Sequence, residues 1–201
     1  MKKNLLLATL MILSVTGVQA QDVSFGIKGG VNFSNFSGDD ADMLETDGRT
    51  GFHLGLIAEI MFTENLGVQP EVLYSSQGAK SDFQMEDEFF GSLSIDEFKL
   101  DYISIPVLLK YYFIEGLSLE VGPQFSFVAN SEVEASMDGV SSTEDFDDET
   151  ESFDFGGALG LGYELPMGLL FQGRYVMGFN DVYTDSDFRN SVFQLSVGFK
   201  F

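Results

Sequence analysis

The chain has 201 residues, with 32 acidic and ten basic side chains and a formal net charge of −22. A nucleic-acid-binding surface needs a basic stripe, which this composition excludes. The absence of cysteine excludes disulfides, iron–sulfur clusters and thiolate metal sites. The 21 phenylalanines and 44% hydrophobic residues argue against disorder, so we expect one folded domain.

Residues 1–20 have the features of a secretory signal peptide. A basic start at Lys2 and Lys3 precedes the apolar stretch Leu5–Val15, and Val18-Gln19-Ala20 ends in a small residue. We therefore predict cleavage after Ala20, export from the cytoplasm and a mature domain over residues 21–201. An uncleaved membrane anchor is the alternative, but the apolar stretch is short for a spanning helix.

From Val23 onward, hydrophobic residues recur at every second position, the pattern of β-strands with one apolar face. The pattern predicts strands at about 23–33, 50–62, 67–79, 99–113, 117–127, 153–163, 169–180 and 193–201. Most of these segments are long enough to cross a membrane as tilted strands, which takes about 9–11 residues.

The connections between the segments alternate strictly between short and long. The short ones are 63–66, 114–116 and 165–168, and the long ones are about 37–49, 80–98, 130–152 and 181–190. This alternation is typical of an outer-membrane barrel with short periplasmic turns and long external loops. The long segments hold 23 of the 32 acidic residues. We therefore predict an all-β, eight-stranded antiparallel up-and-down transmembrane barrel with acidic external loops.

A soluble, lipocalin-like periplasmic binding barrel is an alternative, because it also has eight alternating strands. Its polar face would be turned to water and its apolar face to an internal cavity. The polar face of these segments is rich in glycine, serine and glutamine and carries few charges. A face with so few charged side chains is poorly suited to be the outer surface of a soluble barrel, which favours the membrane barrel.

The inward faces of the predicted strands carry equal numbers of cationic and anionic side chains. The expected lumen charge network consists of Lys28, Lys110, Arg174 and Lys200 with Glu59, Glu71, Glu120 and Glu164. Eight strands leave an interior just wide enough for side chains to fill. Because isolated buried charges are very costly, we expect these side chains to pair and plug the lumen. A narrow charged pore for small solutes or ions is the rival hypothesis.

The C-terminus ends in an aromatic residue on an alternating strand. Phe193, Leu195, Val197, Phe199 and Phe201 resemble the signal that the barrel assembly machinery reads during biogenesis. A girdle of aromatic residues is expected near the short turns, at Tyr111, Tyr112, Phe113 and Tyr163. The expected partners are this machinery, outer-membrane lipid and lipopolysaccharide, and envelope or secretion proteins.

Enzymatic activity has little support in the sequence. The single histidine, His53, could activate water through a pair with Asp47 or Asp101, but a polar lumen side chain is the favoured interpretation. No common nucleophile, zinc or phosphate-binding motif occurs. The acidic run Glu144–Glu149 could bind calcium, yet it lacks EF-hand spacing, so a solvated loop is favoured. We expect no catalytic residues, cofactor or metal.

Several segments resemble the PorT-type outer-membrane β-barrel family of Bacteroidetes-like bacteria. The residues that carry the resemblance are Gly26–Ser34, Val68–Ala79, Leu100–Tyr111, Gly122-Pro123-Gln124, Arg174-Tyr175 and Gly178-Phe179-Asn180. The resemblance implies an eight-stranded barrel in the outer membrane of a Gram-negative-type bacterium and no catalytic residues. The family's named member is linked to type IX secretion, so the resemblance adds a secretion-accessory role to the structural or surface-interaction role expected here.

Overall fold

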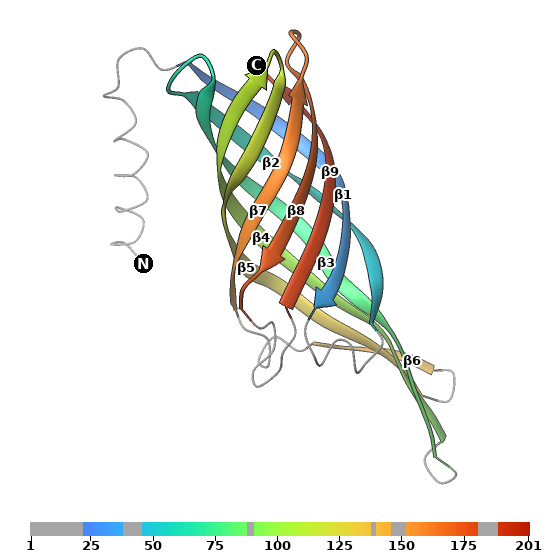
Figure 1. The fold of residues 1–201 in the computed structure, drawn as a ribbon. Helices are drawn as coiled ribbons and strands as arrows, with labels where there is room; N and C mark the ends of the chain where they lie inside the picture. Colours follow the sequence, from blue (N-terminus) through green and yellow to red (C-terminus); the bar gives the residue numbers. More distant parts are fainter. Residues whose placement is uncertain (1–21, 38–45, 88–90, 138–139, 146–151, 181–188) are drawn as a thin grey trace, which may run out of the picture.

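The alternating segments form antiparallel strands that wrap around one axis in the computed structural model (Figure 1). The structure describes residues 22–37, 46–87, 91–137, 140–145, 152–180 and 189–201. The strands are β1 (Val23–Ser37), β2 (Thr46–Met61), β3 (Leu66–Asp87), β4 (Gly91–Ile114), β5 (Leu117–Met137), β6 (Val140–Asp145), β7 (Phe153–Glu164), β8 (Leu169–Gly178) and β9 (Arg189–Lys200).

Eight of these strands close into a barrel. The order around the sheet is β4-β3-β2-β1-β9-β8-β7-β5, and pairing between β4 and β5 joins its two ends. The first and last strands, β1 and β9, pair from Gly26 opposite Lys200 to Ser37 opposite Arg189. The predicted closed eight-stranded antiparallel barrel is therefore confirmed. Strand β6 lies outside the ring and pairs only with the far end of β5 among the described strands.

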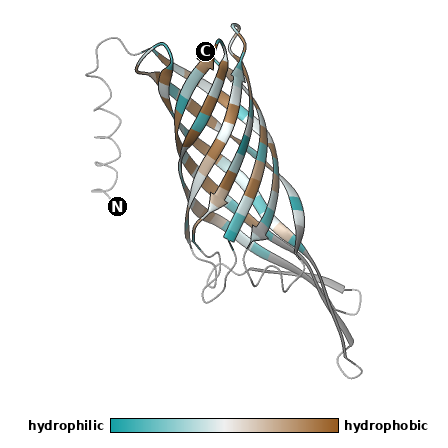
Figure 2. Ribbon diagram, viewed as in Figure 1, coloured by the Kyte–Doolittle hydropathy of each residue, from teal (hydrophilic) through white to brown (hydrophobic). Residues whose placement is uncertain are grey.

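The two faces of the barrel wall have opposite polarity. Large apolar side chains point outward, and Leu54 and Leu56 remain 62% and 63% exposed. Charged and polar side chains such as Lys28 and Glu71 point inward and are buried. Figure 2 shows hydrophobic residues alternating with polar ones along the strands. The lipocalin-like alternative is wrong, because it requires an apolar interior and a polar exterior.

Tight turns join the strands at the end of the barrel that also holds both ends of the folded domain (Figure 1). Gly116 and Gly168 have φ of +75° and +89°, a region that favours glycine, in the turns from β4 to β5 and from β7 to β8. Backbone hydrogen bonds between Phe25 and Phe201 tie the first strand to the C-terminus. In bacterial outer-membrane barrels this short-turn end faces the periplasm, and the opposite end faces the exterior.

The prediction that 80–98 and 130–152 are loops is wrong over much of their length. Strands β3 and β4 remain paired as far as Asp87 opposite Gly91, and β5 pairs with β6 as far as Met137 opposite Val140. We call these extensions, residues 81–87, 91–98, 130–137 and 140–145, the outer sheet; they project beyond the barrel (Figure 1). Apolar residues still alternate there, as in Leu93 and Ile95, although nine of the 29 residues are acidic.

Other expectations fall on parts of the chain that lie outside the described residues. The signal peptide over residues 1–20 and most of the segments 37–49 and 181–190 belong to these parts. Of the acidic run considered for calcium, Glu144 and Asp145 belong to β6 and the rest lies outside. Within the described ranges there is no helix with the length and hydropathy required to span a bilayer.

Candidate functional site in the barrel lumen

Each of the eight barrel strands contributes one charged side chain to the lumen near the short-turn end. We call these residues the ion network: Lys28 on β1, Glu59 on β2, Glu71 on β3, Lys110 on β4, Glu120 on β5, Glu164 on β7, Arg174 on β8 and Lys200 on β9. Inward orientation follows from strand parity, because successive side chains of a strand point to opposite faces. The structure thus brings together all eight residues that the sequence suggested for the lumen.

The centre of the network is an arginine held by two carboxylates. Arg174 donates from Nη1 to Glu71 Oε2 at 2.9 Å and from Nη2 to Glu71 Oε1 at 2.8 Å. Its Nη2 also donates to Glu120 Oε2 at 3.3 Å. Lys28 Nζ lies 2.8 Å from Glu71 Oε2. The paired hydrogen bonds to Glu71 have the fork geometry in which guanidinium and carboxylate match best.

Lys110 connects this centre to the part of the network nearest the short turns. Its Nζ lies 3.2 Å from Glu59 Oε1 and 3.5 Å from Glu120 Oε1, and 5.1 Å from the centroid of the Tyr112 ring. Lys200 forms ion pairs with both Glu59 and Glu164 at the short-turn end. Every carboxylate of the network therefore contacts at least one cation, which offsets the cost of burying the charge.

Neutral polar side chains complete the network. Gln172 donates to both oxygens of Glu120 at 2.8 and 2.9 Å, and its Oε1 accepts from Lys28 at 3.0 Å. Gln69 donates to Glu71 at 2.7 Å and accepts from Lys110 at 3.0 Å. The sequence interpretation omitted both glutamines because it considered only charged residues, although they have the same inward parity.

Tyr112 is not part of the aromatic girdle that the sequence predicted. Its side chain points inward, and its hydroxyl donates to Glu59 at 2.6 Å and lies 3.3 Å from Glu164 Oε2. Its neighbours Tyr111 and Phe113 are exposed on the outer wall, as is Tyr163. Parity explains the difference, since Tyr112 falls between two outward-facing positions.

Glycine provides the space that the long charged side chains occupy. A Cβ on Gly162 would lie 2.5 Å from Glu120 Oε1 and 2.9 Å from Ser118 Oγ. Even alanine at this position would therefore collide with the carboxylate that Arg174 and Gln172 hold. The small residues of β7 and the large ones of β5 and β8 are complementary, as expected for a narrow barrel filled by its own side chains.

His53 lies in a separate polar group toward the loop end. Its Nδ1 donates to Asn32 Oδ1 at 2.7 Å, and Ser196 Oγ lies 2.8 Å from its Nε2. The pair with Asp101 considered from the sequence does not form, because Asp101 accepts from the Tyr74 hydroxyl at 2.8 Å, and Tyr74 is exposed on the outer wall. The side chain of Asp47 lies outside the described part. His53 is thus a buried polar side chain of the lumen.

Four buried apolar side chains form a cluster on the loop side of the ion network. We call Leu108, Ala158, Val176 and Val192 the apolar cluster; all four are buried. Leu108 and Val176 lie two residues along their strands from Lys110 and Arg174, on the side toward the loops. Sequence reasoning missed this cluster, because inward apolar residues interrupt the alternation instead of following it.

The residues with metal-binding side chains do not gather elsewhere. No group of three or more His, Cys, Asp or Glu side chains within the described ranges is arranged to hold a metal ion. The lumen near the short turns holds a balanced, hydrogen-bonded set of charges, with the apolar cluster on its loop side.

A family model described as outer membrane protein beta-barrel domain matches residues 19–184. No curated protein sequence matches the chain. Among solved structures the chain is similar to Neisserial surface protein A, with 17% identity, a TM-score of 0.57, and coverage of 90% of this chain and 99% of that one. It is also similar to Ail, the attachment invasion locus protein of Yersinia pestis, in complex with the heparin analogue sucrose octasulfate. That match has 16% identity, a TM-score of 0.51, and coverage of 90% and 99%. These structural likenesses show the fold alone.

Proposed function

We propose that this chain, which belongs to the outer membrane protein beta-barrel domain family, is a surface-interaction protein. The barrel anchors it in the outer membrane, and the outer sheet is the part that binds a partner. The partner is a cationic segment of an external or envelope protein. The ion network belongs to the anchor, because it fills the lumen instead of leaving a path through it.

The observation that carries this proposal is the charge of the outer sheet. Glu97 lies opposite Glu134 in the register of β4 and β5, and Glu132 lies opposite Asp145 in that of β5 and β6. Like charges directly opposite each other on neighbouring strands are destabilising. Lys80 lies opposite Glu97 and Lys99 opposite Glu132 at the base of the outer sheet, which offsets part of this repulsion. The outer sheet itself holds nine acidic residues and no basic one, so a partner with lysine or arginine side chains would be favoured by electrostatic complementarity.

The ligand of one structural relative gives a useful contrast. Ail was solved with a heparin analogue, which is a polyanion. The four long segments of the present chain hold 23 acidic residues, so a polyanion would be repelled. The proposed ligand therefore has the opposite charge.

The resemblance to PorT-type barrels supports a more specific version of the same proposal. In that version the cationic partner is another envelope protein, and the chain serves as an accessory of protein secretion. Outer-membrane lipid, lipopolysaccharide and the barrel assembly machinery are proposed as partners of the barrel itself, the first two through its apolar outer wall.

The test compares two variants that lose the same number of charges. Asp82, Glu86 and Glu97 of the outer sheet are neutralised in one variant, and Asp39, Asp40 and Asp42 of the first long segment in the other. Each protein is placed in phosphatidylcholine vesicles, and binding of decalysine is measured by isothermal titration calorimetry at physiological salt.

We expect the outer-sheet variant to bind decalysine at least about tenfold more weakly, a change of about 1.4 kcal/mol. The variant of the first long segment should keep most of its affinity. Equal losses in the two variants would show that only the overall charge matters and would contradict the proposal.

A further inference from the structure

The lumen between the apolar cluster and the loop end contains three oxygen atoms without a hydrogen-bond partner. Within the described residues, Gln124 Oε1, Asp154 Oδ1 and Asn190 Oδ1 are buried atoms of this kind. The Gln124 and Asn190 side chains are 4% and 3% exposed. We call these three residues the acceptor cluster. A buried acceptor without a partner destabilises the folded state, so three of them require a reason.

The amide oxygens are free because the amide nitrogens are already used. Asn190 donates from Nδ2 to the Tyr102 hydroxyl at 3.0 Å, a contact that reaches across the lumen from β9 to β4. Gln124 donates from Nε2 to Ser126 Oγ at 3.2 Å. A further hydrogen bond from the Asn190 side chain to the Asp154 carboxylate, which only accepts, orients the Asn190 amide. The hydrogen-bonding capacity left at the cluster is therefore that of acceptors.

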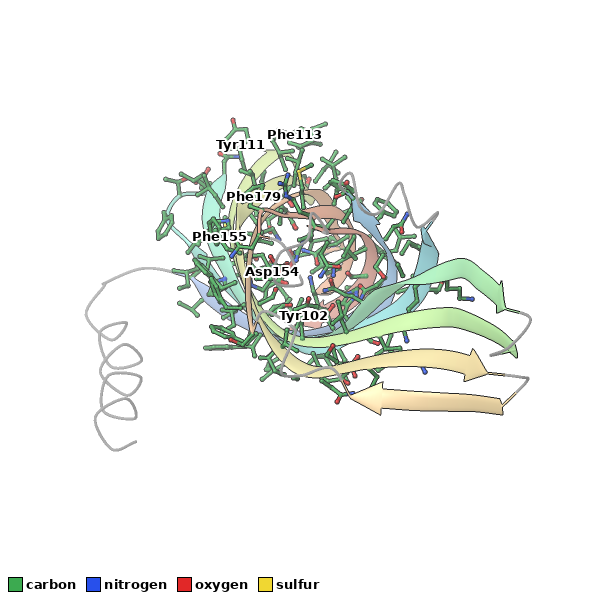
Figure 3. All side chains as sticks on the ribbon, turned by 90° about the horizontal axis from the view of Figure 1, so that it is seen from below. Tyr102, Tyr111, Phe113, Asp154, Phe155 and Phe179 are labelled. Carbon is green, nitrogen blue, oxygen red and sulfur yellow. The ribbon has the colours of Figure 1, made fainter. Side chains whose placement is uncertain are left out.

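The three residues lie on neighbouring rows of the barrel wall. Gln124 pairs in register with Gly156, and Asp154 is the next inward residue of the same strand β7. A Cβ on Gly178 would lie 3.3 Å from Asp154 Oδ1 and 3.3 Å from Asn190 N, so both residues lie beside Gly178, and the Asn190 side chain also hydrogen-bonds to the Asp154 carboxylate. Viewed along the barrel from its loop end, Asp154 and Tyr102 lie inside the ring of strands (Figure 3).

The surroundings of the cluster favour a cation from the exterior. The apolar cluster lies on the short-turn side: Val192 and Asn190 are two residues apart on β9 and both are buried. Along β7 and β9, Ala158 and Val192 therefore lie between the acceptors and the charged residues of the ion network. On the other side, the outer sheet carries nine acidic residues and no basic one. Such a field raises the local concentration of cations at the mouth.

We propose that the acceptor cluster is a binding site for a primary ammonium group of a small organic cation that enters from the outside. An ammonium has three hydrogen-bond donors and no acceptor, which matches three acceptor oxygens without partners. A divalent metal is less suitable, because the cluster offers one carboxylate and calcium takes six to eight oxygen ligands.

The site is tested with the mature chain in lipid nanodiscs and 1,4-diaminobutane as the probe. Calorimetry gives the affinity, and the side-chain amide signals of Gln124 and Asn190 in nuclear magnetic resonance spectra report the place of binding. Asp154→Asn removes the charge and keeps the shape. Asp101→Asn is the matched control, because it removes one charge from the outer wall, where Asp101 accepts from Tyr74.

We expect saturable binding by the parent, at least tenfold weaker binding by Asp154→Asn and a change of less than twofold in Asp101→Asn. Gln124→Glu places a second carboxylate at the cluster and should strengthen binding several-fold, which keeps the test decisive if Asp154→Asn does not fold. Absence of saturable binding by the parent, or equal losses in Asp154→Asn and Asp101→Asn, would overturn the proposal. Saturable binding of calcium that depends on Asp154, with no binding of the diamine, would overturn the assignment of the ligand class.

Discussion

Replacing Arg174 by methionine tests the energetics of the ion network. The side chain of methionine fills part of the same volume but donates no hydrogen bond. The substitution removes two hydrogen bonds to Glu71, at 2.9 and 2.8 Å, and one to Glu120 at 3.3 Å. Four carboxylates then face three cations in a buried lumen. Removal of one partner from a buried ion pair costs about 3–5 kcal/mol, and we expect a loss of this size.

The free energy of unfolding is measured by urea titration of the barrel in phospholipid bilayers, followed by circular dichroism and by gel mobility of unboiled samples. With a slope of about 2 kcal/mol per molar urea, a loss of about 4 kcal/mol lowers the midpoint by about 2 M. Arg189→Met is the control, because Arg189 is exposed at the loop end of β9. Its effect should stay within about 0.5 kcal/mol.

A second substitution separates charge from packing. Arg174→Met combined with Glu120→Gln restores the balance, since Glu71 keeps Lys28 at 2.8 Å and Glu59 keeps Lys110 at 3.2 Å. The double variant should recover about 1–3 kcal/mol relative to Arg174→Met, as expected for coupled residues. A urea midpoint of Arg174→Met equal to that of the parent would show that the buried ion pairs of Arg174 do not stabilise the barrel. A double variant no more stable than Arg174→Met would show that the unpaired charge is not the cause of the loss.

Three further predictions concern the packing of the barrel wall, the assembly signal at the C-terminus and the cleavage of the signal peptide. Gly162→Ala should destabilise the barrel by about 1–3 kcal/mol, because its Cβ would meet Glu120. Gly173→Ala is its control: the nearest atom to the new Cβ is Leu195 Cδ2 at 3.7 Å, and urea midpoints should show little change. Phe201→Ala should lower the yield of folded barrel in the outer membrane without preventing refolding in detergent, whereas Phe113→Ala at the same end should not; equal yields would argue against an assembly signal. The intact mass of the protein from outer membranes should correspond to a chain beginning at Gln21, and a mass that includes residues 1–20 would contradict the predicted cleavage.

The barrel could be predicted from the sequence because a membrane wall imposes strict alternation. One face of each strand contacts lipid and the other the lumen, so residues such as Phe52 and His53 reveal their sides by polarity alone. The same parity placed the members of the ion network, since a charged residue between two apolar neighbours has only the lumen available. Composition and connection length then indicated the orientation.

Other features depend on contacts between strands, which the alternation of side chains along a single strand does not reveal. The partner of Arg174 is Glu71, which is 103 residues away in sequence and on a strand that does not neighbour β8. The outer sheet could not be predicted, because its acidic residues favour a solvated loop, whereas pairing between neighbouring strands keeps these segments extended. Inward apolar residues such as Leu108 and Val176 break the alternation, and only the closed ring shows that they meet.

Whether paired charges close the lumen is tested by the ion conductance of the purified barrel in planar lipid bilayers. The ion network draws one charged side chain from every strand of the ring, and each of its carboxylates contacts a cation. We expect no large, steady conductance from the parent protein. Large, steady currents from the folded parent barrel would contradict this expectation and would favour a narrow charged pore.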